Sequence, residues 1–193
     1  SHLMSVHTSS AVESLSPVFV ALKHIGAVTR DAMIPIRNRL LMRERFEKGD
    51  GWTALLSLRL LPAPADEENY ILDIGSHEHE NRLSIFVDTR GDLTFRLIDA
   101  VGARQYLRTG RVGHAIPFAS PIIIFCEMSK VGDECLLSIR ANGWDHAKVV
   151  PGDALGRIGN PFHFVVGSDC FGKKHTHMDL FGTVLIASPL SSL

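Results

Sequence analysis

Two histidine pairs have the spacing that best suits metal chemistry. His77 and His79 stand two positions apart in one segment, and His175 and His177 stand two positions apart in another. Imidazoles at i and i+2 of an extended backbone point the same way, which suits zinc or nickel. If the two segments meet, four imidazoles converge on one metal. The alternative, which is the more frequent one in a chain with ten histidines, is that exposed loops merely tolerate this residue.

A pair of carboxylates is the minimum requirement for glycosidase chemistry, one on each side of the scissile bond. The nearest pair in the chain is Glu78 and Glu80. They follow Gly75 and Ser76, which indicate a loop, where alternate residues need not share a face. We interpret them as solvated loop charges and expect that the chain is not an enzyme.

Two aromatic residues are candidate platforms for a sugar ring, which needs an aromatic face and fixed polar groups for its hydroxyls. Trp144 has Asp145 beside it, and Phe86 shares a predicted sheet face with Arg96. Asp145 or Asn81 would then supply hydrogen bonds. The structural alternative is the more frequent role for both aromatics. In that case Trp144 closes the edge of the core, and the sheet face that carries Phe86 is covered.

These candidates lie in or between short apolar runs that are bounded by Gly, Pro, Asn and Asp, a pattern that predicts β-strands. The predicted strands are residues 52–61, 69–75, 82–88, 92–99, 105–109, 121–128, 134–140, 144–150, 162–167 and 181–187. Residues 18–25 and 32–36 are further candidates, although 15–24 could equally form a short helix. So many short strands at this spacing predict an antiparallel β-sandwich or barrel with little helix, mostly near the N-terminus.

The hairpin over residues 82–99 is the clearest element, because Gly91 can adopt the positive φ of a short turn. Alternation places six apolar residues on one face, which we expect to be buried: Leu83, Ile85, Val87, Leu93, Phe95 and Leu97. The opposite face carries Ser84, Phe86, Thr94 and Arg96. We expect that face to be mixed and partly solvated, as in many antiparallel sheets.

Several of these runs resemble the concanavalin A-like lectin/glucanase superfamily, in its laminin G-like jelly-roll branch. The matching segments lie between Phe46 and Leu193: FEKGDGWT with ALLSLRL, ILDIG, RLSIFVDTRGDLTFRLID, LLSIRANG, FHFVVGSDCFG and LFGTVLIASPLS. The chain departs at Ala119-Ser120-Pro121, where the family often has Trp-His. The resemblance implies a two-sheet β-sandwich, a fold that hosts lectins, hydrolases, adhesion modules and spacers.

The same resemblance bears on catalysis and on metals. Hydrolases of this fold usually carry Glu-x-Asp-x-Glu on one strand, and the chain has no such run. Laminin G-like domains often hold calcium at the rim of the sandwich, through Asp side chains and carbonyls. Glu80-Asn81 stands near the place of one acidic ligand and Asp145 is a candidate for another, although neither is an Asp in a clear motif. Calcium or another divalent metal is thus the cofactor that the resemblance allows.

Composition limits the partners. With 20 Lys+Arg against 21 Asp+Glu the net charge is −1, so we expect neither nucleic-acid binding nor attraction to anionic lipid. The apolar run at 121–126 is too short for membrane insertion. Three cysteines are too few for a disulfide framework and are expected to be free thiols. Free thiols and no visible signal peptide favour the cytoplasm, but Ser1–Met4 resembles a cloning remnant, so the native start and the compartment stay open.

The length of 193 residues suits one domain, which we expect over residues 16–193 after a flexible lead over 1–15. The sequence favours a non-catalytic, lectin-like, carbohydrate-binding domain. The alternatives are a protein-interaction or spacer module of a larger protein and, least favoured, a glycoside hydrolase. The expected partner is therefore a glycan or a protein, and the oligomeric state is open.

Overall fold

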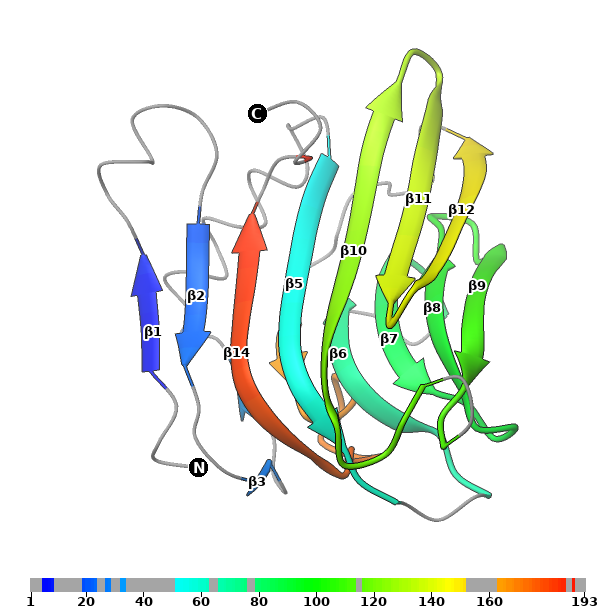
Figure 1. Ribbon diagram of the computed structural model, residues 1–193. Coiled ribbons are helices and arrows are strands. Elements are labelled where there is room, and N and C mark those ends of the chain that lie inside the picture. The colour runs from blue at the N-terminus through cyan, green and yellow to red at the C-terminus, as the bar shows by residue number, and fades with distance from the viewer. Residues whose placement is uncertain are drawn as a thin grey trace.

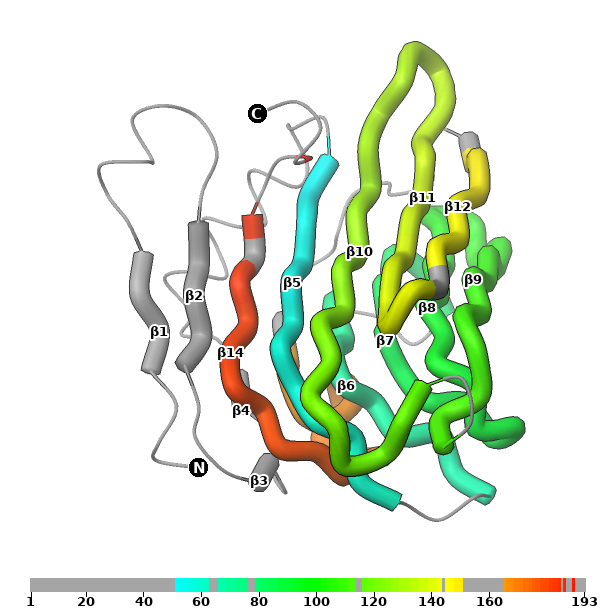
Figure 2. The backbone as a smooth tube through the Cα atoms, viewed as in Figure 1, coloured from blue at the N-terminus to red at the C-terminus, as the bar shows by residue number. Residues whose placement is uncertain are grey.

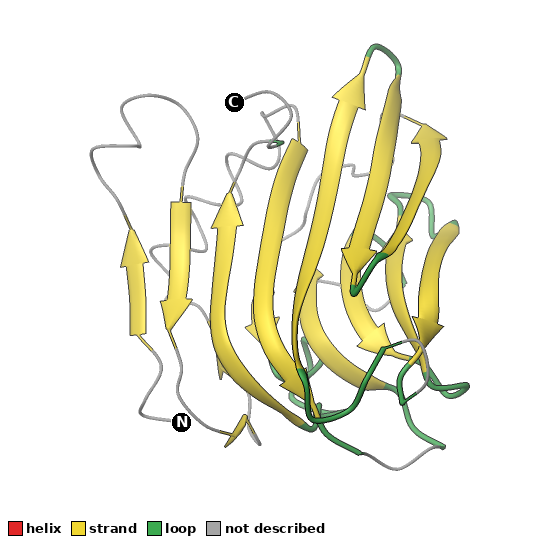
Figure 3. Cartoon of the chain, in the orientation of Figure 1, coloured by secondary structure: helices red, strands yellow, loops and turns green. Residues whose placement is uncertain are grey.

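Two antiparallel β-sheets packed face to face make up the described part of the chain in a computed structural model (Figure 1). The structure describes residues 5–8, 19–23, 27–28, 32–33, 51–62, 66–75, 79–113, 116–151, 163–186 and 189. Strands and loops account for all of these residues, and none of them is helical (Figure 3). In the same ranges no helix is long and apolar enough to cross a membrane.

One sheet has eight strands. In spatial order they are β1 (Ser5–Thr8), β2 (Phe19–Lys23), β14 (Met178–Ile186), β5 (Gly51–Leu60), β10 (Pro121–Val131), β11 (Glu134–Ala141) and β12 (Trp144–Pro151), with β3 (Ala27–Val28) beside β14. Figure 2 shows the late strand β14 lying beside the much earlier β5. Sequence neighbours are therefore often not spatial neighbours in this sheet.

The second sheet has six strands. Their order is β4 (Ala32–Met33), β13 (His163–Val166), β6 (Asn69–Gly75), β7 (Arg82–Val87), β8 (Asp92–Ile98) and β9 (Arg104–Arg111). The prediction of an all-β, antiparallel two-sheet sandwich is confirmed. Of the two interpretations of residues 15–24, a strand is present at Phe19–Lys23. Ser5–Thr8, within the predicted lead, is paired as β1, whereas residues 9–18 lie outside the described residues.

The core lies between the sheets and is built by alternation. In β5 every second residue from Trp52 to Leu60 is buried, and five of the six inward residues predicted for the hairpin are buried too. The sixth, Val87, is half-buried at one end of the sandwich and packs against the core. Cys126 and Cys135 are buried as predicted. Their positions on the β10–β11 ladder are four residues apart, because Cys135 pairs with Lys130, so they cannot form a disulfide.

The outer face of the six-stranded sheet corrects the sequence analysis. We expected this face to be partly solvated, yet its hairpin residues are all buried: Ser84, Phe86, Thr94 and Arg96. The segment Gly167–His177 contacts this face, where the backbone N–H of Cys170 donates to Oδ2 of Asp73 (2.7 Å). The ring of Phe171 lies against the guanidinium of Arg82. Polar residues can be buried here because they are partners of one another.

Candidate ligand-binding cavity at the rim of the sandwich

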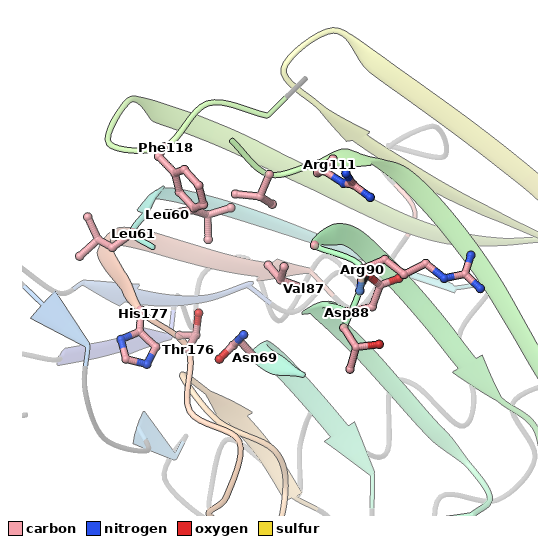
Figure 4. Close-up of a pocket in the computed structure, with 13 residues that line it drawn as sticks. Leu60, Leu61, Asn69, Val87, Asp88, Arg90, Arg111, Phe118, Thr176 and His177 are labelled. Carbon is pink, nitrogen blue, oxygen red and sulfur yellow. Dashed lines mark hydrogen bonds between the residues drawn. The ribbon is translucent and has the colours of Figure 1, made fainter. Parts of the chain in front are cut away.

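A cavity of about 460 Å³ lies at one end of the sandwich (Figure 4). The strands β5, β7 and β9 end there, and β6, β10 and β14 begin there. Its size falls in the range of small-molecule sites. The described residues that line it come from all of these strand ends: Leu60, Leu61, Asn69, Val87, Asp88, Thr89, Arg90, Gly91, Arg111, Val112, Phe118, Thr176 and His177.

The inner walls of the cavity are apolar. Leu60 from the eight-stranded sheet is 2% exposed, and Val112, just after β9, is 7% exposed. Both belong to the core, and Val87 packs against it. The cavity is therefore a part of the space between the two sheets that side chains leave unfilled.

Phe118 forms the aromatic side of the cavity and is 40% exposed. Its loop is held to both sheets, because Ala119 N–H donates to the carbonyl of Leu60 (2.9 Å) and Val112 N–H donates to that of Gly91 (2.7 Å). Gly113 (φ +89°) allows the ring to lie close to the backbone. A Cβ atom at Gly113 would lie 2.6 Å from Cε2 of Phe118.

The β7–β8 turn forms the opposite side and is held by Asp88. Oδ1 of Asp88 accepts hydrogen bonds from the backbone N–H groups of Arg90 and Asp92, both at 2.9 Å. Its Oδ2 accepts from Thr94 Oγ1 (3.2 Å) and from Arg108 Nε (3.3 Å). Both oxygens of this carboxylate are therefore engaged within the protein.

Two arginines give the cavity an excess of positive charge. Arg90 and Arg111 lie on the same side of it, away from Leu61 and His177, and the Arg90 side chain extends outward from the cavity (Figure 4). Their guanidinium groups form no hydrogen bond or ion pair with any described residue, including Asp92, the ladder partner of Arg111. Charges left free at the mouth of a cavity are available to a ligand.

The segment Gly167–His177 lines a further side of the cavity, next to Leu61. Thr176 N–H donates to the carbonyl of Gly167 (3.0 Å), and Leu61 N–H donates to that of His177 (2.9 Å). These bonds hold Thr176 and His177 against the cavity, below Leu60 and Leu61 in Figure 4, with Thr176 only 2% exposed.

One turn motif recurs in these loops. In DTRG, DAVG and DCFG, which begin at Asp88, Asp99 and Asp169, the aspartate Oδ1 accepts from the N–H groups two and four residues later. The glycine N–H donates to the aspartate carbonyl in all three. The sequence analysis did not use this D-x-x-G signal, which predicts rigid turns in two segments that form the cavity.

A buried ion pair fixes the segment Gly167–His177 against the six-stranded sheet. Arg82 donates to Asp73 through Nε (3.0 Å) and Nη2 (2.6 Å), and Ser84 Oγ donates to the same carboxylate (2.6 Å). Burial alone lowers the pKa of Arg82, but the hydrogen bonds and charge of Asp73 outweigh it and raise that pKa. Burial raises the pKa of the Cys170 thiol, and Asp73 raises it further.

Phe86 and Arg96, predicted as ligand-binding residues, are part of this buried network. Phe86 is 1% exposed and stacks on Tyr70 (ring centroids 4.9 Å apart), with the Arg96 guanidinium 4.8 Å from its centroid. Arg96 Nη2 donates to the Tyr70 hydroxyl (2.9 Å). Burial raises the pKa of Tyr70, against the opposing effect of Arg96. Phe86 therefore presents no open ring face to a ligand in this structure.

The other predicted sugar-binding residues lie away from the cavity. Trp144 begins β12 next to the Asn142-Gly143 turn, and its side chain lies outside the described part. Asp145 forms an exposed ion pair with Arg140 (3.2 Å). Asn81 precedes β7 at the far end of the six-stranded sheet. Asp145 belongs to the eight-stranded sheet, whereas Asn81 precedes a strand of the six-stranded sheet.

The structure does not bring the described histidine of the first pair, His79, together with His175 and His177. His175 forms a β-bridge with Tyr70 near the start of β6, and His177 lies at the cavity. His79 follows the other end of β6, and His77 lies outside the described residues. Among the residues that were placed, no group of three or more His, Cys, Asp or Glu is arranged to hold a metal ion. A metal site thus stays a prediction without a described geometry.

Residues missed by the sequence analysis dominate the cavity: Asn69, Arg90, Arg111, Val112 and Phe118. One feature of the sequence could have indicated the position of Phe118. Phe118 is an aromatic residue in a stretch with Gly113 and Pro117, where no strand alternation requires it. Of the predicted site residues whose side chains the structure describes, only His177 lines the cavity.

Solved structures with this fold include binding domains. The CBM40 domain of the Ruminococcus gnavus IT-sialidase, bound to α2,3-sialyllactose, matches with a TM-score of 0.62 and 8% identity, over 86% of this chain and 91% of that chain. The NanB sialidase of Streptococcus pneumoniae matches with a TM-score of 0.60 and 14% identity, over 88% of this chain and 26% of that one. The binding domain of botulinum neurotoxin DC, in complex with rat synaptotagmin II, matches with a TM-score of 0.56 and 10% identity, over 97% of this chain and 42% of that chain.

These likenesses establish the fold. The chain spans about a quarter of the length of the NanB sialidase chain. No family model and no curated protein matches the sequence.

Proposed function

We propose that the chain is a non-catalytic carbohydrate-binding module that binds an acidic glycan at the rim cavity. The observation that carries the proposal is the cavity itself, which combines the exposed ring of Phe118 with Arg111 and the neighbouring Arg90, whose guanidinium groups have no partner among the described residues. The neighbours include a CBM40 domain bound to sialyllactose. Together with the sequence resemblance, this supports placing the chain in the laminin G-like branch of the concanavalin A-like superfamily.

The charges favour an acidic sugar over a neutral one. An arginine fork matches a carboxylate or a sulfate in a bidentate geometry. Asp88 is the one carboxylate among the described lining residues, and its two oxygens are already engaged. A ligand anion would therefore meet Arg111 and, after a rotation of its side chain, Arg90, neither of which has a competing partner among the described residues.

The same carboxylate supports a non-catalytic role. Hydrolysis of a glycosidic bond needs two carboxyl groups that face each other across the substrate. Asp88 holds the β7–β8 turn and has no second carboxylate opposite it among the described lining residues.

The test is calorimetry against neutral and acidic oligosaccharides, with Phe118→Ala as the variant. Loss of one large apolar contact is expected to weaken binding by about 1.5–3 kcal/mol, roughly a factor of 10 to 150. Phe181→Ala is the matched control. Phe181 is similarly exposed (42%) but lies on the outer face of the eight-stranded sheet, away from the cavity. Equal affinities for neutral and acidic sugars, or equal losses in the two variants, would contradict the proposal.

A protein-interaction module is the second candidate, and one surface favours it. The outer face of the eight-stranded sheet exposes Ile123 on β10 and Phe181 on β14. Phe125, two residues after Ile123 on β10, is half-buried. Its arginines are paired with aspartates, Arg59 with Asp179 for example. A neutral, apolar sheet face suits a protein partner, and the neighbours include a toxin domain in complex with synaptotagmin. No response to any sugar would favour this candidate.

A further inference from the structure

The interior of the rim cavity differs in chemistry from its mouth. Leu60, Val87 and Val112 form the inner wall and reach into the space between the two sheets. The charged lining groups belong to the β7–β8 turn and the end of β9, as with Arg90 and Arg111, whereas two polar lining residues, Asn69 and Thr176, are themselves buried beside the apolar wall (Figure 4). A ligand that fills the cavity therefore meets two environments.

A sugar ring alone does not match the inner wall. Its hydroxyls need hydrogen-bond partners once they leave water, and aliphatic side chains offer none. Ordered water would meet the same lack of polar partners there. A hydrocarbon group fits, because its transfer from water to an apolar wall is favourable in proportion to the area buried.

We infer that the inner part of the cavity is a subsite for an apolar substituent of the acidic glycan, such as an N-acyl chain or an alkyl aglycone. This inference rests on the proposed function. The sugar ring and its acid group lie at the mouth, against Phe118 and the two arginines. The substituent enters between the sheets and contacts Leu60 from one sheet and Val87 from the other.

The experiment measures affinity along two series built on one acidic sugar. In the first the N-acyl chain grows from acetyl to butanoyl, and in the second the alkyl aglycone grows from methyl to butyl. Each buried methylene is expected to raise affinity by about three- to fourfold. The series that shows this slope identifies which end of the sugar faces the cavity.

Two variants of Val87 test where the acyl or alkyl group of the ligand binds. Val87→Thr makes the inner wall polar at nearly constant volume and should flatten the slope, and Val87→Phe should do so by filling the space. Val149→Thr is the matched control, because Val149 is exposed on β12, away from the cavity, and the slope should not change. Thermal unfolding of each variant checks that it is folded.

The outcomes separate the two proposals. Binding of the parent acid with no gain along either series overturns the apolar subsite and leaves the proposed function standing. An equal slope in the Val87 and Val149 variants likewise overturns the apolar subsite and leaves the proposed function standing. No binding of the parent sugar or of any derivative overturns the proposed function and the subsite with it.

Discussion

Replacement of Asp73 by asparagine tests whether the buried network on the six-stranded sheet holds the fold together. Asp73 is fully buried and accepts hydrogen bonds from Arg82, Ser84 and the backbone of Cys170. Asparagine keeps the volume but removes the negative charge that pairs with Arg82, which is only 5% exposed. Breaking a buried pair in this way costs about 3–5 kcal/mol of unfolding free energy.

Two further variants identify the cause of that loss. Asp145→Asn breaks the exposed pair with Arg140, and because water screens such pairs the expected loss is about 0–1 kcal/mol. The double variant Asp73→Leu with Arg82→Met removes both buried charges. It should recover most of the stability lost in Asp73→Asn, because no buried charge is left unpaired.

Urea unfolding is the assay, followed by circular dichroism and by the fluorescence of the buried Trp52. With a slope of about 2 kcal/mol per molar urea, the expected loss lowers the midpoint by roughly 1.5–2.5 M. A fall of less than about 0.5 M in Asp73→Asn at unchanged slope, equal to that of Asp145→Asn, would refute the reasoning. It would mean that water reaches Arg82 and screens its charge.

Three other predictions concern two cysteine properties and one glycine. Denatured protein without reductant should titrate three free thiols. Burial raises the pKa of Cys126 and Cys170 in the folded state, so their stabilising effect is complete below the unfolded thiol pKa of about 8.5 and is lost above it. The urea midpoint should fall between about pH 8 and pH 10, less steeply in Cys126→Ala, and an equal slope would contradict this. Gly113→Ala should displace the Phe118 ring and weaken glycan binding. Gly132→Ala, at φ +62° in open space, should lose only about 1–2 kcal/mol of stability to backbone strain and keep binding unchanged.

Local sequence was enough to predict the strands, because alternation and turn residues act within a few positions. The strand at residues 69–75 was predicted with the bounds that β6 has, and the inward face of the β7–β8 hairpin was predicted in the right register. The core positions of Cys126 and Cys135 followed from the same alternation.

Alternation shows which side chains share a face, but it does not show what covers that face. Ser84 and Arg96 were expected near solvent and are buried, because the segment Gly167–His177, far later in the chain, contacts their sheet. The pairing of Arg82 with Asp73 was likewise hidden, since it depends on the β6–β7 register and on the removal of water by that segment.

The rim cavity is a product of tertiary structure alone. Leu60, Val87, Phe118 and Thr176 are separated by tens of residues, and backbone hydrogen bonds between strand ends bring them to one place. The order of strands in the sheets decides which connections meet at each end of the sandwich. That order placed the segments of His79 and His177 at opposite ends of β6. The free energy that selects it comes from burying the whole core between the sheets, which no local segment of the sequence reports.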